Sequence, residues 1–223
     1  MIGEADGSIG VLERVASART MPPPRRIQAH ATGRTTVTMI LPRKTALIVI
    51  DVQQGFNDPR WGARNNPDAE ANIARLLAAF RAKGRPVIHV QHDSAAPDGA
   101  FRPGTPGHRP KPEAVPHEGE PVYRKSVNSA FIGTTLERDL RDAGIEGLVI
   151  VGLTTNHCVS TTTRMAGNFG FATSIVADAT ATFERMGMDG TMRPAAEVHA
   201  SALSDLRDEF AAVVDTDAVI AAV

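Results

Sequence analysis

Apolar runs alternate with amphipathic segments along most of the chain. Residues 45–50 (TALIVI) form a continuous, partly β-branched apolar run, which is typical of a strand buried on both faces. Further strands are predicted at residues 86–90, 121–124, 148–151, 172–177 and 211–214. Apolar residues at helical spacing predict helices over residues 67–83, 134–143, 158–169 and 194–210, with one more helical turn after the last strand.

The order of these elements predicts the fold class. Strands that alternate with helices favour an α/β protein with three layers (α/β/α), a mostly parallel, doubly wound sheet and right-handed crossovers. The helix ends support this reading, because Asn66 is a suitable N-cap before Pro67 and Gly84 follows the end of the same helix. We therefore expect one domain over residues 39–223.

Two segments lack this periodicity. Residues 1–38 have weak apolar spacing and three consecutive prolines, so we expect a flexible or partner-packing extension, with Met39 as an alternative start of the protein. Residues 93–120 form a proline-rich loop of a length that is usually functional or disordered. We favour a cover for the active site or a subunit contact over disorder.

Composition narrows the class of protein. The 223 residues include 24 lysines and arginines against 25 aspartates and glutamates, so the net charge of -1 gives no reason to expect nucleic acid or an anionic membrane as a partner. No apolar run reaches the roughly 18 residues that a membrane span needs, and the N-terminus lacks the apolar stretch of a secretory signal. We expect a cytoplasmic protein with a small-molecule substrate.

Reactive side chains follow the ends of several predicted strands. Asp51 ends the first strand, His92 the second and Lys125 the short third one, while Cys158 follows the strand at 148–151. Ligands bind beyond the carboxyl ends of the strands in doubly wound sheets. These four residues are therefore expected at one edge of the sheet.

Cys158 is the one cysteine of the chain, so it forms no internal disulfide. A lone cysteine is more often a buried structural residue than a nucleophile. Here it falls at a predicted helix N-terminus, where the dipole and a nearby lysine would lower the thiol pKa from roughly 8.5. A carboxylate could then accept the thiol proton and return it to a leaving group.

Three segments resemble the isochorismatase-like cysteine hydrolase superfamily. They are residues 46–56 (ALIVIDVQQGF), 125–131 (KSVNSAF) and 151–159 (VGLTTNHCV), in the family's order and separation. The resemblance covers roughly residues 41–214 and implies a catalytic triad of Asp51, Lys125 and Cys158. It also implies a cis peptide bond between Leu153 and Thr154, and an oxyanion hole formed by the backbone amides of Thr154 and Cys158.

Other residues near these motifs are candidates for substrate contacts. They are Gln53, Phe56, His92, Asn128, Phe131 and His157. Phe56 can equally be a core residue, and His157 can have a structural role, because consecutive residues at a helix start point in different directions. His199 is expected to pack its helix against the domain.

The resemblance spans branches with different chemistry. Nicotinamidases of this family hold a divalent metal with an Asp-x-His pair after the second strand, whereas this chain has Gln91, His92 and Asp93 there. Isochorismatases that cleave a vinyl ether need the acid but not the thiol. Since Cys158 is present, we expect a hydrolase of a small amide, ureide, lactam or imide-type C–N bond, with no metal and no cofactor.

Three alternatives remain at this point. They are a vinyl ether hydrolase that uses Asp51 as its acid, a redox-sensing protein and a non-catalytic binding protein. Members of the family commonly form dimers or tetramers, so the resemblance also implies a homodimer or homotetramer.

Overall fold

The computed structural model describes residues 39–223, and the extension predicted for residues 1–38 lies outside the described part. A six-stranded sheet has the order β3-β2-β1-β4-β5-β8, and every neighbouring pair of strands is parallel. The strands are β1 (Thr45–Ile50), β2 (Val87–His92), β3 (Val122–Lys125), β4 (Gly147–Leu153), β5 (Ala172–Ala181) and β8 (Ala212–Val214). The predicted doubly wound α/β fold is confirmed.

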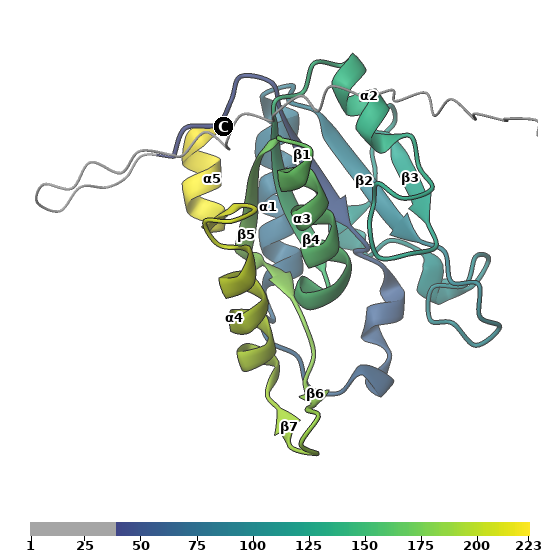
Figure 1. Cartoon of the computed structure of the whole chain (residues 1–223). Helices are drawn as coiled ribbons and strands as arrows, with labels where there is room; N and C mark the ends of the chain where they lie inside the picture. Colours follow the sequence, from purple (N-terminus) through teal and green to yellow (C-terminus); the bar gives the residue numbers. More distant parts are fainter. Residues whose placement is uncertain (1–38) are drawn as a thin grey trace, which may run out of the picture.

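Helices cover both faces of the sheet (Figure 1). Helices α1 (Ala69–Ala82) and α5 (Thr216–Ala222) pack with one core, while α2 (Leu136–Asp142), α3 (Ser160–Asn168) and α4 (Ala195–Leu206) pack with the other. Alternate residues of β1 supply the two cores: Leu47 faces α1, and Ile48 faces α2 and α3. This period of two explains why all six residues of β1 are buried.

The order of the strands reverses between β1 and β4. The first three strands extend the sheet toward β3, and the later strands extend it toward β8. A crevice for ligands forms at such a switch point, beyond the carboxyl ends of the strands. Asp51 follows β1 and Thr154 follows β4, so both residues lie at this point.

Several boundaries differ from the prediction. β5 continues to Ala181, because its end pairs with the end of β4 after a shift in register. A short antiparallel ribbon of β6 (Arg185–Met186) and β7 (Met192–Arg193) was not predicted, since two-residue strands carry almost no periodic signal. The predicted helix at 158–169 is preceded by a π-helical turn, Thr155–Val159, which contains Cys158.

The loop over residues 93–120 is held against the segment that follows β1. Its two 3₁₀ turns are Pro106–His108 and Pro112–Ala114. The Lys111 amide donates to the carbonyl of Val52 at 2.9 Å, and the Gln54 amide donates to the carbonyl of Arg109 at 2.8 Å. Backbone bonds on both sides of residue 53 therefore fix the loop beside the sheet edge where ligands are expected.

Glu70 on α1 links this loop to the rest of the domain. Its carboxylate accepts from Lys111 Nζ at 2.6 Å and from both terminal nitrogens of Arg64 at 2.8 Å. Burial alone would raise the pKa of Glu70, but the hydrogen bonds from Arg64 and Lys111 outweigh burial and lower the pKa to about 2. The charged form of Glu70 is therefore favoured by folding.

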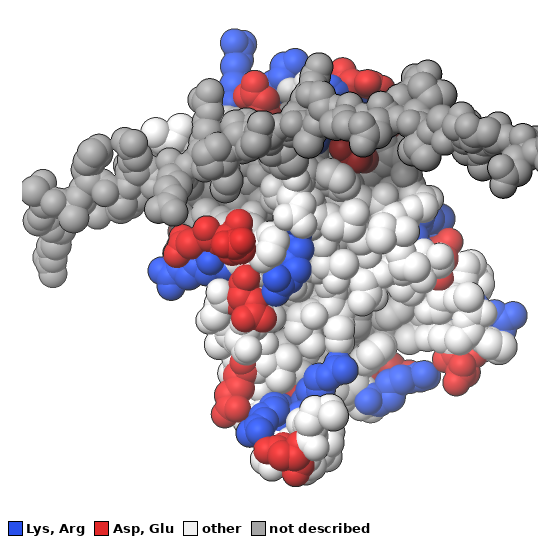
Figure 2. Space-filling view, viewed as in Figure 1, with Lys and Arg blue, Asp and Glu red and all other residues white. Residues whose placement is uncertain are grey.

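Figure 2 shows acidic and basic side chains side by side around a broad uncharged middle on the face drawn. Within residues 39–223, no helix has the length and apolar character needed to cross a membrane.

We predict that Glu70→Gln lowers the free energy of unfolding by about 2–3 kcal/mol at neutral pH, because it removes the charge that Arg64 and Lys111 surround. A lowered folded-state pKa stabilises the fold above the ordinary value of 4.5, and this stabilisation is lost as the pH falls toward about 2. Urea unfolding between pH 2 and 7 should show the difference from wild type shrinking in that window. The exposed loop variant Glu113→Gln should match wild type throughout; equal stability of all three proteins at pH 7 would refute the prediction.

Candidate active site

A buried ion pair lies at the carboxyl edge of the sheet. Lys125 Nζ donates to Asp51 Oδ2 at 2.6 Å, and the two side chains are 0% and 1% exposed. Lys125 ends β3 and is the register partner of His92 at the end of β2. Since β2 lies between β3 and β1, the lysine side chain reaches across one strand to the aspartate.

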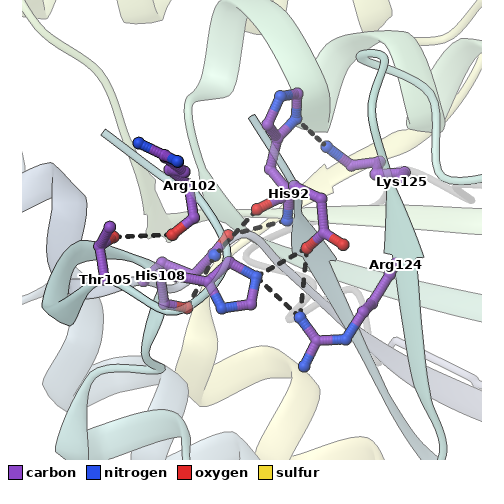
Figure 3. A network of polar contacts seen from close by, with 8 residues as sticks. His92, Arg102, Thr105, His108, Arg124 and Lys125 are labelled. Atoms are coloured by element: carbon purple, nitrogen blue, oxygen red, sulfur yellow. Dashed lines mark hydrogen bonds and ion pairs between the residues drawn. The ribbon is translucent and has the colours of Figure 1, made fainter. Parts of the chain in front are cut away.

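His92 is the second partner of the lysine. Figure 3 shows Lys125 and His92 pointing toward each other, with Lys125 Nζ 3.2 Å from His92 Nδ1. Burial, followed by the charge of Lys125, lowers the pKa of His92, so its ring is neutral and Nδ1 accepts from the ammonium. In the same view His108 meets Arg124. Both side chains also contact Asp93 Oδ1, at 2.7 Å from His108 Nε2 and 3.2 Å from Arg124 Nη1.

The end of β4 and the connection that follows it lead to Cys158. Gly152 has a φ of 122°, and a Cβ at this position would lie 1.9 Å from the carbonyl oxygen of Ile50, so only glycine fits. The Leu153–Thr154 peptide bond is cis, at the position that the family resemblance implies. The π-helical turn begins at the next residue, Thr155, and it places the buried thiol of Cys158 close to Asp51, the residue that follows β1.

The expected low pKa of the thiol is wrong. Burial and the negative charge of Asp51 raise the pKa of Cys158 to about 12, and Lys125 offsets only part of this effect. The helix terminus does not lower the thiol pKa, because the burial of the thiol and the acid that shares the site outweigh it. Cys158 is therefore a neutral thiol in the free protein.

A carboxylate oxygen of Asp51 lies within 4.8 Å of the thiol sulfur, while the thiol donates to Asn128 Oδ1 at 3.8 Å. Burial raises the pKa of Asp51 above the ordinary value of 3.8, although the ammonium of Lys125 opposes this shift. Its second oxygen, Oδ1, is buried and has no hydrogen-bond partner within residues 39–223. Asp51 has a positive φ of 51°, a conformation that aspartate adopts more readily than most residues. A buried carboxylate with a raised pKa and a free oxygen is suited to act as a base.

A cavity of about 290 Å³ opens above these groups. Among the predicted substrate contacts, Phe56, His92, Asn128 and His157 line it, together with the three residues Asp51, Thr154 and Cys158. Two further lining residues, Trp61 and Phe101, were not predicted. Both lie in segments without helical or strand periodicity, so the pattern gave no reason to choose them. The one signal in the sequence is that Trp61 is the single tryptophan of the chain.

The aromatic residues form one wall of the cavity. The ring of Phe56 lies 4.6 Å from that of Phe101 and 5.3 Å from that of Trp61, and Phe183 packs behind them at 5.9 Å from Phe56. Phe101 belongs to the loop over residues 93–120, so this loop contributes directly to the cavity, as the cover interpretation expects. The wall offers an apolar, flat surface opposite the polar groups.

Two predicted contacts lie elsewhere. Gln53 is fully buried, donates to the carbonyls of His92 and His108 and accepts from the amide of His92, so it ties the loop to β2. Phe131 packs in the core with its ring 5.2 Å from Phe169. Neither side chain lines the cavity. Gln53 makes hydrogen bonds within the protein and Phe131 packs in the core, and the sequence motif does not distinguish these roles from substrate contact.

His199 has the packing role expected for it. The ring is buried on α4, and its Nδ1 lies 2.8 Å from Thr155 Oγ1 in the turn that carries Cys158. This contact links α4 to the nucleophile turn.

Within residues 39–223, Asp51, His92 and Cys158 form a group that could hold a metal, since one ligand atom from each lies within 4.8 Å of the others. Their donor types suit Zn²⁺. Two of the three, however, already bind the ammonium of Lys125, whose side chain is fully buried. Lys125 therefore already supplies a positive charge to Asp51 Oδ2 and His92 Nδ1.

Comparison with known proteins identifies the family to which this chain belongs. The family model of the Isochorismatase domain matches residues 45–218. The chain belongs to the isochorismatase family. The isochorismatase family protein YrdC of Bacillus subtilis is 48% identical over 177 residues, covering 79% of this chain and 95% of YrdC.

A solved isochorismatase-family hydrolase from Chromobacterium violaceum has a TM-score of 0.80 and 44% identity, covering 91% of this chain and 98% of that one. Ureidoacrylate amidohydrolase RutB of Methylobacterium radiotolerans is 31% identical over 175 residues, which cover 62% of this chain and 67% of RutB. The protein is therefore an isochorismatase-family hydrolase.

We predict that iodoacetamide alkylates Cys158 slowly at pH 7, with a rate that still rises at pH 10, because burial and Asp51 hold its pKa at about 12. Asp51→Asn removes the negative charge and leaves Lys125, so the thiol pKa falls and alkylation at pH 7 becomes at least about tenfold faster.

The rates are read by intact-mass spectrometry, which reports this one cysteine. Asp98→Asn, which neutralises an exposed loop carboxylate, should match wild type. A plateau of the wild-type rate below pH 9, or slower alkylation of Asp51→Asn, would contradict the assigned electrostatics.

Proposed function

We propose that this isochorismatase-family hydrolase is a metal-independent cysteine hydrolase, which cleaves a C–N bond of a small amide, ureide, lactam or similar substrate through a thioester on Cys158. The observation that carries the proposal is a base and a neutral thiol that line one cavity, with a cation buried against the base. Asp51, Lys125 and Cys158 are the proposed catalytic residues.

The first half of the reaction forms the thioester. Asp51 takes the proton of Cys158, and the thiolate sulfur adds to the carbonyl carbon of the substrate. The carbonyl oxygen becomes an oxyanion, for which the backbone amides of Thr154 and Cys158 are the proposed donors. Lys125 balances the negative charge of the site while the proton moves.

The second half regenerates the thiol. The C–N bond breaks as Asp51 returns the proton to the nitrogen, and ammonia or an amine leaves. A water molecule, deprotonated by the same carboxylate, attacks the thioester carbon and releases the acid. The sulfur leaves and recovers its proton from Asp51, so each cycle consumes one water and leaves the protein unchanged.

The cavity supports a small substrate. Its volume of about 290 Å³ is at the lower limit of small-molecule sites, which span roughly 300–1,000 Å³. Phe56, Trp61 and Phe101 favour a planar group, such as a conjugated amide or ureide, stacked against the wall. The activity in the name of the relative RutB, ureidoacrylate amidohydrolase, belongs to this chemical class.

One observation favours a second candidate function. Burial raises the pKa of Asp51, and a protonated carboxyl is what the cleavage of a vinyl ether by acid requires. That reaction would leave Cys158 without a chemical step, so the thiol separates the two functions.

The test is ammonia release from a panel of small amides, ureides and lactams in the presence of EDTA. We expect wild type to turn over at least one of them, and Cys158→Ala to lose activity on the order of 10⁴-fold or more, because the covalent route is gone. Thr161→Ala, a change on α3 outside the cavity lining, is the matched control and should keep the wild-type rate.

Equal rates for wild type and Cys158→Ala would remove the thiol from the mechanism and support ether cleavage by Asp51. Loss of wild-type activity with EDTA, restored by a divalent metal, would overturn the metal-independent part of the proposal. If wild type releases no ammonia from any member of the panel, C–N hydrolysis of these substrate classes is refuted.

A further inference from the structure

An exposed arginine reaches the cavity through a histidine. Arg185, at the start of β6, has its Nη1 2.7 Å from His157 Nε2. His157 lines the cavity beside Thr154 and Cys158. The ribbon that carries Arg185 is therefore connected to the active site by a direct side-chain contact.

This contact defines the protonation of the imidazole. A guanidinium has only donors, so Nε2 must present its lone pair, and the ring proton of a neutral His157 must lie on Nδ1. Asn156 Nδ2 also faces Nε2 at 3.4 Å. The Asn156 amide is oriented by Thr182, whose Oγ1 donates to Asn156 Oδ1 at 2.5 Å. Burial, followed by the charge of Arg185, lowers the pKa of His157, which agrees with a neutral ring.

The tautomer in turn decides what the Thr154 hydroxyl does. His157 Nδ1 lies 3.0 Å from Thr154 Oγ1, so the N–H on Nδ1 donates to this oxygen. The hydroxyl then accepts one hydrogen bond and keeps its own hydrogen. Within residues 39–223, Thr154 Oγ1 has no acceptor for that hydrogen. Thr154 lines the cavity, so the free donor is available to a bound molecule.

We propose that the Thr154 hydroxyl donates a hydrogen bond to the carbonyl oxygen of the substrate as the oxyanion develops, and that Arg185 is a positioning residue which holds this donor ready through His157. The identity of the acceptor rests on the proposed function, whereas the tautomer does not. The hydroxyl adds to the two proposed backbone donors a third donor that depends on a surface residue more than twenty positions away in the chain.

Loss of Arg185 has a specific consequence. Without the arginine, only the long 3.4 Å contact from Asn156 Nδ2 still faces Nε2, so the imidazole can take the other tautomer, with its proton on Nε2 and a lone pair on Nδ1. The Thr154 hydroxyl would then donate to Nδ1, and its hydrogen would no longer serve the substrate. An arginine that instead bound the substrate directly would change KM and leave the tautomer as it is.

The first arm of the test is long-range ¹H–¹⁵N NMR of the histidine rings in the free protein, with His157 assigned from the signals missing in His157→Gln. We expect the Nδ1–H tautomer in wild type and a shift toward Nε2–H in Arg185→Ala. Arg185→Lys, which keeps a donor, should retain the wild-type tautomer. Arg193→Ala is the control, because Arg193 lies on the same ribbon and pairs with Asp189. An Nε2–H tautomer in wild type, or no change in Arg185→Ala, would overturn the positioning role.

The second arm is steady-state kinetics on an amide that wild type hydrolyses. We expect Thr154→Val to lower kcat about 10²-fold with KM nearly unchanged, Thr154→Ser to stay close to wild type, and Arg185→Ala to lower kcat about tenfold with rescue by Arg185→Lys. An unchanged kcat in Thr154→Val, or an effect of Arg185→Ala on KM alone, would refute the proposal. If wild type hydrolyses no amide, the proposed function and the assigned acceptor fail together, while the NMR arm still decides the positioning role.

Discussion

The buried ion pair of Asp51 and Lys125 is the interaction on which the site depends. Taking both charges out of water costs free energy, so each must remain satisfied by the other and by neighbouring polar groups. The pair joins the ends of β1 and β3 across β2, and His92 on β2 gives the ammonium its second acceptor. Removing one partner would leave an uncompensated buried charge, at a cost of about 3–5 kcal/mol.

The same burial acts on both groups between which the proton moves. It raises the pKa of both Asp51 and Cys158, so the thiol keeps its proton near neutral pH in the free protein. A proton can instead pass from the thiol to the free oxygen of the carboxylate when a substrate fills the cavity and replaces water. The aromatic wall, which includes Phe101 from the loop over residues 93–120, supports this exclusion of water.

Most of the fold could be predicted from the sequence, because buried parallel strands have continuous apolar runs and their helices have clear boundaries. The meeting of Asp51, Lys125 and Cys158 followed from their positions after strands in a doubly wound sheet. The ribbon of β6 and β7 could not be predicted, since it has no periodicity. The positions of Trp61 and Phe101 in the cavity wall, and of Gln53 and Phe131 outside it, depend on how irregular segments pack. The thiol pKa depended on burial and on an acid distant in sequence, neither of which a local helix argument includes.

The most direct test of this account is the infrared S–H stretching band, which reports Cys158 alone because the chain has one cysteine. The account predicts that the band is present in wild type at pH 7 and persists beyond pH 9, and that it weakens at pH 7 in Asp51→Asn, where Lys125 stabilises the thiolate unopposed. A wild-type protein with no S–H band at pH 7 would contain a preformed thiolate, and would contradict the central claim that Asp51 and burial hold the thiol neutral until substrate binds.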